Sequence, residues 1–279
     1  MKPFIRQLRE DFHKEACQDL IRIDGDNLNF ADTSSRLSKL FAAGVVQNLG
    51  IKPPNGRMPG QTAGQIFENK VKEYLEKAFN KLSHLRPGSW GYENGASITT
   101  FEQYSHLTAL QIAATSNPEL AVILGGDYII KPDIVIYRKP ETDDAINKPL
   151  RLIDKDTATL TPLRASANRK KILHASISCK WTIRSDRSQN SRTEALNLIR
   201  NRKGNLPHIM VVTAEPLPSR LASIALGTGD IDCVYHFALP ELQKAVYDSE
   251  QEDSIEILKT MVEGRRLRDI TDLPFDLAI

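Results

Sequence analysis

Strand patterns that alternate with helical patterns constrain this chain most strongly. In KILHASISCKW (171–181), apolar and polar residues alternate, which is typical of a β-strand. Two further apolar runs, 206–216 and 230–239, have the length and residue types of buried strands. Helical patterns at 191–203 and 219–227 separate the three strands. Because such elements pack as layers, we expect an α/β fold with a central mixed β-sheet flanked by helices on both faces, with α+β as the alternative.

The remaining segments extend this fold at both ends. Residues 61–82 have apolar residues at helical spacing, and Thr99 to Glu102 resembles the start of a helix that runs to about 115. Two apolar runs on either side of Gly125-Gly126, within 121–138, predict a hairpin. The sequence contains no clear linker. We therefore expect a single domain, 1–279, with an N-terminal helical part at about 1–115, a β-rich core at about 120–240 and a C-terminal helical part at about 240–279.

Composition excludes several classes of protein. Of the 279 residues, 41% are hydrophobic and 26% are charged, which argues against disordered and fibrous chains. No apolar run approaches the 18 or so residues that a transmembrane helix needs, and the N-terminus lacks the apolar segment of a signal peptide. The three cysteines lie far apart in the sequence, so we expect no disulfide framework. These features predict a cytoplasmic protein with no membrane partner.

Positive charge is concentrated in one segment, although the net charge of the chain is only +2. Residues 164–203 contain seven Arg and four Lys against two acids, a local charge of +9. The acids gather elsewhere, at 140–144 and 247–256. Such a separation favours a basic face that binds a polyanion such as a nucleic acid. The alternative is a solvated basic surface with no ligand.

Two residues near the expected sheet have the chemistry of a phosphodiesterase site. Lys180 ends the alternating strand, on the same face as Ser178, and Asp133 follows Pro132 in the second run of the expected hairpin. If their strands are neighbours, the Asp133 carboxylate and a nearby backbone carbonyl can hold Mg²⁺, while the Lys180 ammonium orients or activates water. The alternative is an unrelated turn aspartate and surface lysine.

A second group of residues is suited to reading DNA bases. Arginine pairs bidentately with the O6 and N7 atoms of guanine, and aspartate accepts a hydrogen bond from N4 of cytosine. Arg184, Asp186 and Arg187 supply both residue types within four positions of the basic segment. They would therefore favour G·C and C·G pairs. An Arg–Asp salt bridge within the loop is the competing interpretation.

Segment 176–220, together with KPDIVIY (131–137), resembles a known family. It is similar to the type II restriction endonucleases of the PD-(D/E)xK superfamily, in the group that recognises CCGG. Pro132-Asp133 is followed after 46 residues by Lys180, and after a further 13 by Glu194, which is the variant motif of that group. The resemblance implies a restriction-endonuclease-like core. It also implies an enzyme that makes Mg²⁺-dependent, sequence-specific double-strand cuts in DNA.

The resemblance also implies roles for individual residues of the catalytic site. Asp133 would bind metal together with the backbone carbonyl of Cys179, and Lys180 would be the motif lysine. Glu68, in the expected helix at 61–82, would be a further acid that binds metal. Two Mg²⁺ ions per active site are expected. Glu68 has a plain alternative, because Lys72 stands four residues later and could form a helical ion pair with it.

The motif departs from the usual pattern at one position. Ser178 stands where most members have an acid, and the resemblance implies that Glu194 supplies the missing carboxylate as a catalytic residue. Glu194 has a structural alternative, since Ser191-Arg192-Thr193-Glu194 fits a capping box at the start of a helix. The sequence leaves both roles open.

Recognition and assembly follow from the same resemblance. The site would be GCCGGC, the enzyme would be a homotetramer built from dimers, and a cytosine methyltransferase would be its genetic partner in a bacterial restriction-modification system. Two alternative functions remain, namely a non-catalytic sequence-specific DNA-binding protein and a structure-selective nuclease of the same superfamily. The residues expected to contact DNA are Arg184, Asp186 and Arg187 at CCGG in the major groove, Gln61 in the minor groove, and Arg220 and Ser34 at the outer base pair.

Overall fold

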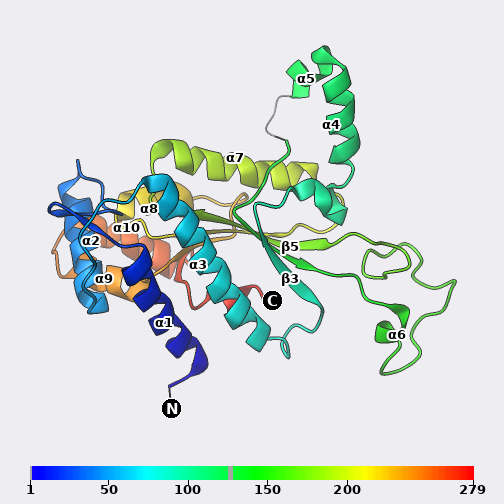
Figure 1. The fold of residues 1–279 in the computed structure, drawn as a ribbon, viewed down its shortest axis with the longest axis horizontal. Coiled ribbons are helices and arrows are strands. Elements are labelled where there is room, and N and C mark those ends of the chain that lie inside the picture. The colour runs from blue at the N-terminus through cyan, green and yellow to red at the C-terminus, as the bar shows by residue number, and fades with distance from the viewer. Residues whose placement is uncertain (1, 125–127) are drawn as a thin grey trace. The chain divides into compact units, whose positions relative to one another are not determined.

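A computed structural model of the chain describes residues 2–124 and 128–279, with the side chains of 124 and 185–188 excluded (Figure 1). The chain forms two compact units. The first unit contains residues 2–82, 178–192 and 209–279, and the second contains the described residues of 83–177 together with 193–208. No helix among these described residues is long and apolar enough to cross a membrane.

Six strands form one mixed sheet, in the order β3-β4-β5-β6-β7-β8. The pairs β3–β4 and β4–β5 are antiparallel, whereas β6–β7 and β7–β8 are parallel. This topology confirms the predicted α/β fold with a central mixed sheet. The strands are β3 (Trp90–Asn94), β4 (Ile134–Arg138), β5 (Ile172–Lys180), β6 (His208–Thr213), β7 (Cys233–His236) and β8 (Leu267–Asp269).

Helices connect and cover the parallel strands of the first unit. Helix α2 packs against α9, α1 against α3, and α8 against α10. In α3 the buried residues Phe67, Val71, Tyr74 and Ala78 recur every three to four positions, which confirms the helix predicted at 61–82. The elements are α1 (Phe4–Asp19), β1 (Ile23–Asp24), β2 (Asn27–Leu28), α2 (Arg36–Leu49), α3 (Gly60–Lys81), α8 (Pro218–Ala225), α9 (Leu239–Tyr247), α10 (Glu252–Glu263) and α11 (Leu273–Asp276).

The second unit is built around the antiparallel strands β3, β4 and β5. Its 3₁₀ helix η2 is tied to α7, because the Tyr104 hydroxyl donates a hydrogen bond of 2.9 Å to the Leu198 carbonyl. The helix expected from Thr99 is preceded by two short 3₁₀ turns and becomes α-helical only at Leu107. The elements are η1 (Ile98–Thr100), η2 (Glu102–Tyr104), α4 (Leu107–Ser116), α5 (Pro118–Leu124), α6 (Asp143–Ile146) and α7 (Ser185–Asn201), whose first residues belong to the first unit.

The hairpin expected at 121–138 is only half correct. Its second arm is strand β4, but its first arm lies in helix α5. Pro118 occupies the first turn, and the Asn117 side chain accepts hydrogen bonds from the backbone amides of Glu119 and Leu120, at 3.0 and 3.3 Å. This N-terminal cap starts a helix despite the strand-like apolar run that follows. Gly125 and Gly126, the expected turn, lie outside the described residues.

Helix α7 begins six residues earlier than the sequence indicated. It starts at Ser185 rather than Ser191, and the Ser191 side chain is buried within the helix. The expected capping box at Ser191 to Glu194 is therefore wrong, because a cap must lie at the helix N-terminus. Glu194 occupies the interior of α7.

Strand β5 is covered on both faces over most of its length. The apolar face of Leu173, Ala175 and Ile177 is buried, and so are His174 and Ser176 on the polar face. Lys180, at the end of the strand, is half-buried. A strand with neighbours on both edges and cover on both faces positions its final residues rigidly.

Candidate nucleic-acid interface and active-site residues

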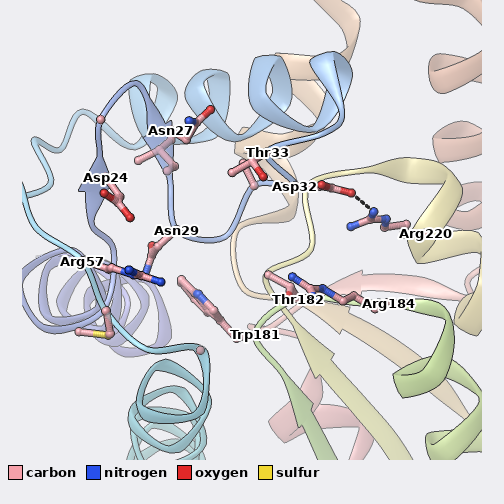
Figure 2. A pocket seen from close by; sticks show the side chains of 15 residues that line it. Asp24, Asn27, Asn29, Asp32, Thr33, Arg57, Trp181, Thr182, Arg184 and Arg220 are labelled. Atoms are coloured by element: carbon pink, nitrogen blue, oxygen red, sulfur yellow. Dashed lines mark hydrogen bonds and ion pairs between the residues drawn. The ribbon is translucent and has the colours of Figure 1, made fainter.

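A pocket in the first unit collects three arginines. It has a volume of about 440 Å³ and lies among the β1–β2 hairpin, the segment before α3, the segment after β5 and helix α8. Figure 2 shows Arg57, Arg184 and Arg220 around this pocket, with Asp24 and Asp32 near them. Three cations against two carboxylates leave a positive local charge, which suits a polyanion.

Arg220 is held at the pocket by a carboxylate. Its guanidinium forms an ion pair with Asp32, drawn as a dashed line in Figure 2. Oδ1 of Asp32 also accepts hydrogen bonds from the hydroxyl and the amide of Ser34, at 2.7 and 2.9 Å. These bonds from Ser34, followed by the charge of Arg220, lower the pKa of Asp32 to about 2. The carboxylate therefore stays charged at neutral pH and keeps Arg220 oriented.

Arg184 lines the same pocket as Arg220 but is exposed and is not held by a described carboxylate. It lies four residues beyond the end of β5. No hydrogen bond or ion pair joins its guanidinium to another residue whose side chain the structure describes. Arg57, also exposed, has no such partner within the described ranges either. As far as the described side chains show, their donors are available to a ligand.

The indole of Trp181 forms an apolar wall of the pocket. Its ring lies 5.5 Å from Phe30, 5.2 Å from Phe67 and 6.1 Å from Phe237, measured between ring centroids. The indole Nε1 is buried and has no hydrogen-bond partner in the part of the chain that the structure describes. A buried donor without a partner is uncommon in folded proteins, so this indole contributes to the pocket through its apolar ring.

The structure gathers most of the expected DNA contacts around this pocket. Arg184 and Arg220 line it, and Ser34 is bonded to Asp32, which also lines it. Gln61 is exposed in the first turn of α3, directly after the pocket residue Gly60. The two remaining expected contacts, Asp186 and Arg187, have side chains that lie outside the described residues.

Three residues of this region had not been expected from the sequence: Asp32, Arg57 and Glu215. Glu215 follows β6, and its buried carboxylate lies 3.9 Å from the guanidinium of Arg220. The sequence offered one indication of Glu215, because a glutamate that follows an apolar strand pattern can be buried and then needs partners. Asp32 and Arg57 lie in polar loops whose composition does not distinguish them from ordinary surface residues.

The expected catalytic residues are distributed over both units. Glu68 in α3 and Lys180 at the end of β5 belong to the first unit, whereas Asp133 and Glu194 belong to the second. All four side chains are half-buried. Asp133 immediately precedes β4, in which Ile134 pairs with Ile177 of β5.

One alternative role left open by the sequence is wrong. Glu194 does not cap a helix, because α7 begins nine residues before it. The two possible roles of Glu68 stay open. All three cysteines lie in the described part of the chain, where they are buried and form no disulfide. A contribution from Cys179 is therefore restricted to its backbone carbonyl.

The sequence and its relatives define one class of protein, the type II restriction endonucleases, which cut DNA at specific sequences. The chain belongs to the NgoMIV restriction enzyme family, whose model matches residues 12–279. It is 50% identical over 286 residues to the type II restriction enzyme NgoMIV of Neisseria gonorrhoeae, and the match covers 100% of both chains. The predicted family and enzyme class are thus confirmed.

Two solved structures are also similar to this chain, with much lower sequence identity. A complex of the restriction endonuclease PspGI with substrate DNA matches 99% of this chain and 92% of its own, with 13% identity and a TM-score of 0.32. The Bse634I restriction endonuclease matches 80% and 81%, with 16% identity and a TM-score of 0.35. The family assignment depends on the NgoMIV relative and the family model.

Proposed function

We propose that this enzyme cuts both strands of DNA at the CCGG-containing palindrome GCCGGC, with Mg²⁺ as its cofactor. The observation that carries the proposal is the pocket of the first unit, where Arg184 and Arg220 lie together at one cavity. An arginine that pairs with guanine O6 and N7 contributes about 1–3 kcal/mol of discrimination against other bases. A site rich in G·C pairs matches that chemistry.

Different residues of the pocket would read different parts of the site. Arg184, together with Asp186 and Arg187, would contact the CCGG bases in the major groove. Arg220 and Ser34 would read the outer base pair, since Asp32 holds both of them at the pocket. Gln61 would reach the minor groove from the start of α3.

The residues proposed to hold the metal are all oxygen donors. They are the carboxylates of Asp133 and Glu68 and the backbone carbonyl of Cys179, a donor set that suits a hard cation such as Mg²⁺. The described residues include no cluster of three or more His, Cys, Asp or Glu side chains placed to hold a metal. Mg²⁺ sites in phosphoryl-transfer enzymes commonly use one or two carboxylates, with water and substrate oxygens completing the shell.

Lys180 and Glu194 would act on the reacting groups. The Lys180 ammonium would orient the attacking water and stabilise negative charge on the scissile phosphate. Glu194 would supply the carboxylate that Ser178 lacks. When bound, Mg²⁺ lowers the pKa of coordinated water and polarises a phosphoryl oxygen. Joint action of Asp133 and Lys180 is proposed from the motif spacing, in which Lys180 follows Pro132-Asp133 after 46 residues.

Assembly and cellular context complete the proposal. We infer a homotetramer built from dimers, with two Mg²⁺ ions per active site, in the bacterial cytoplasm. A cytosine methyltransferase of the same specificity would protect the host DNA. Sedimentation of the purified protein with cognate DNA tests the tetramer.

Digestion of a sequenced plasmid tests the activity. With Mg²⁺ we expect discrete fragments whose ends all map to GCCGGC, and no cleavage in EDTA. Lys180→Ala should bind the same DNA and fail to cut it. Binding without Mg²⁺-dependent cleavage by the wild type would favour a non-catalytic DNA-binding protein. Fragments with ends at no fixed sequence would favour a structure-selective nuclease.

A further inference from the structure

Glu215 is a buried acid that the proposed chemistry does not use. Its side chain is only 1% exposed, and it follows strand β6 at the start of the turn into α8. Oε2 accepts a hydrogen bond of 2.8 Å from the amide of Ile183, and Oε1 accepts one of 3.1 Å from the amide of Leu217. Both oxygens of the carboxylate are therefore engaged by backbone donors.

The two amides belong to the two segments that carry the pocket arginines. Ile183 directly precedes Arg184, and Leu217 is the N-cap residue of α8, which carries Arg220. Nη1 of Arg220 also lies 3.9 Å from Oε2. One carboxylate thus joins two segments that are otherwise separated by more than thirty positions in the chain.

Neighbouring contacts keep this carboxylate in place. The Glu215 amide donates to the hydroxyl of Thr213 at 3.1 Å, and the Ala214 amide donates to the Lys180 carbonyl at 3.4 Å. Thr213 is fully buried. The end of β6, and with it Glu215, is therefore fixed against the end of β5.

We propose that Glu215 is a positioning residue that fixes Arg184 and Arg220 relative to each other and thereby sets how well the pocket discriminates its DNA sequence. This inference rests on the proposed function, because it assumes that both arginines read bases. A displacement of about 1 Å weakens a bidentate contact strongly. A rigid link between the two segments therefore matters for discrimination between DNA sequences.

The link is sensitive to pH. Burial raises the pKa of Glu215 to about 7, against the opposing effects of the Ile183 and Leu217 amides and of Arg220. Asp32 raises this pKa further, while His236 at the end of β7 stays uncharged because burial lowers its own pKa to about 4. A protonated carboxyl group has one weaker acceptor. The hydrogen bond from one of the two amides should therefore weaken as the pH falls below about 7.

Glu215→Gln tests the inference with little change in shape. An amide side chain has one acceptor oxygen, so it satisfies only one of the two backbone donors. The measurement is the ratio of dissociation constants for cognate DNA and for DNA with one base pair changed, in Ca²⁺, at about pH 6 and pH 8. We expect the wild-type ratio to fall about tenfold at the lower pH, and the Glu215→Gln ratio to be low at both.

Leu242→Ala is the matched control. Leu242 is fully buried in α9 of the same unit, which packs against α2, so its truncation destabilises the unit through lost packing and removes no hydrogen bond to Glu215. It should keep the wild-type ratio and pH profile. If Glu215→Gln does not fold, the wild-type profile alone decides the question.

Two results would overturn the inference. One is a wild-type ratio that is the same at both pH values, and the other is a Glu215→Gln ratio equal to that of the wild type. Because binding is measured without cleavage, the outcome is separate from that of the proposed catalysis. A protein that binds with the expected ratios but never cuts plasmid DNA would contradict the catalytic proposal alone.

Discussion

Arg184 and Arg192 lie eight positions apart in one basic segment, yet the structure uses them in opposite ways. Arg184 is exposed at the pocket of the first unit. Arg192 forms an ion pair with Asp230, and its guanidinium donates to backbone carbonyls at and beyond the end of α8, among them that of Ile224 at 3.1 Å. Among the side chains that the structure describes, the first arginine has no partner and can serve a ligand, whereas the second stabilises the fold.

Arg164, at the start of the same segment, repeats the second pattern. Its side chain is 4% exposed, and it donates to both oxygens of Asp143 at 2.7 Å and to the Asp154 carbonyl at 2.7 Å. The local charge of +9 therefore does not form one continuous basic face. A count of charges indicates that a segment is basic, but only the location of the acceptors shows which cations remain for DNA.

The largest expected effect concerns Glu194, which does not cap a helix because α7 begins at Ser185. Glu194→Gln should lower Mg²⁺-dependent cleavage at least about 100-fold, the lower end of what a positioned catalytic side chain contributes. Its unfolding free energy should change by less than the roughly 1 kcal/mol that removal of an N-cap costs. Thr193→Ala, at the exposed neighbouring position of α7, is the control for cleavage. Normal cleavage by Glu194→Gln would remove this residue from the proposed site.

Replacement of Arg192 sharpens the comparison of the two arginines. Arg192→Ala should lower the unfolding free energy by about 1–3 kcal/mol, because Asp230 and several carbonyls lose their donor. The preference for cognate DNA should remain. Denaturant unfolding measures the loss, with Arg200→Ala, exposed in the same helix, expected within about 0.5 kcal/mol of the wild type. A weaker DNA preference at unchanged stability would place Arg192 with Arg184.

The smallest expected effect concerns Asp32. Because of its ion pair with Asp32, Arg220 lines the pocket as Arg184 does and is paired with an acid as Arg192 is. The pKa of Asp32 is lowered to about 2, so its contribution to stability is present above about pH 4 and is lost as the pH falls toward 2. Because this pair is partly exposed, the effect should stay below about 1 kcal/mol. The gap in stability between wild type and Asp32→Asn should shrink as the pH falls from about 4 toward 2.

Regular spacing of apolar residues predicted several of the helices and strands correctly. The helix at 61–82 and the strands at 171–181, 206–216 and 230–239 all exist, because burial on a sheet or a helix face imposes a period on apolar residues. The start of α7 was missed because its first residues, SDRSQN, are polar and carry no period. Helix α5 was missed because a cap at Asn117 outweighed a strand-like composition.

The site was predicted in part, for a different reason. Arg184 came from the chemistry of the basic segment, and Arg220, Ser34 and Gln61 came from a family resemblance. The structure places all four at or beside one pocket. Glu215 was not predicted, because its partner Ile183 lies 32 positions away and no local pattern encodes such a contact. Side chains that act by linking distant segments become visible only once the fold is known.

Equilibrium binding of Arg184→Ala tests the central claim, that an open arginine at this pocket reads the DNA sequence. Dissociation constants are measured in Ca²⁺ for the cognate site and for a site with one base pair changed. We predict that the variant weakens cognate binding by about 1–3 kcal/mol and leaves binding to the changed site nearly unaffected. Equal weakening on both DNAs would make Arg184 a phosphate contact and contradict the claim.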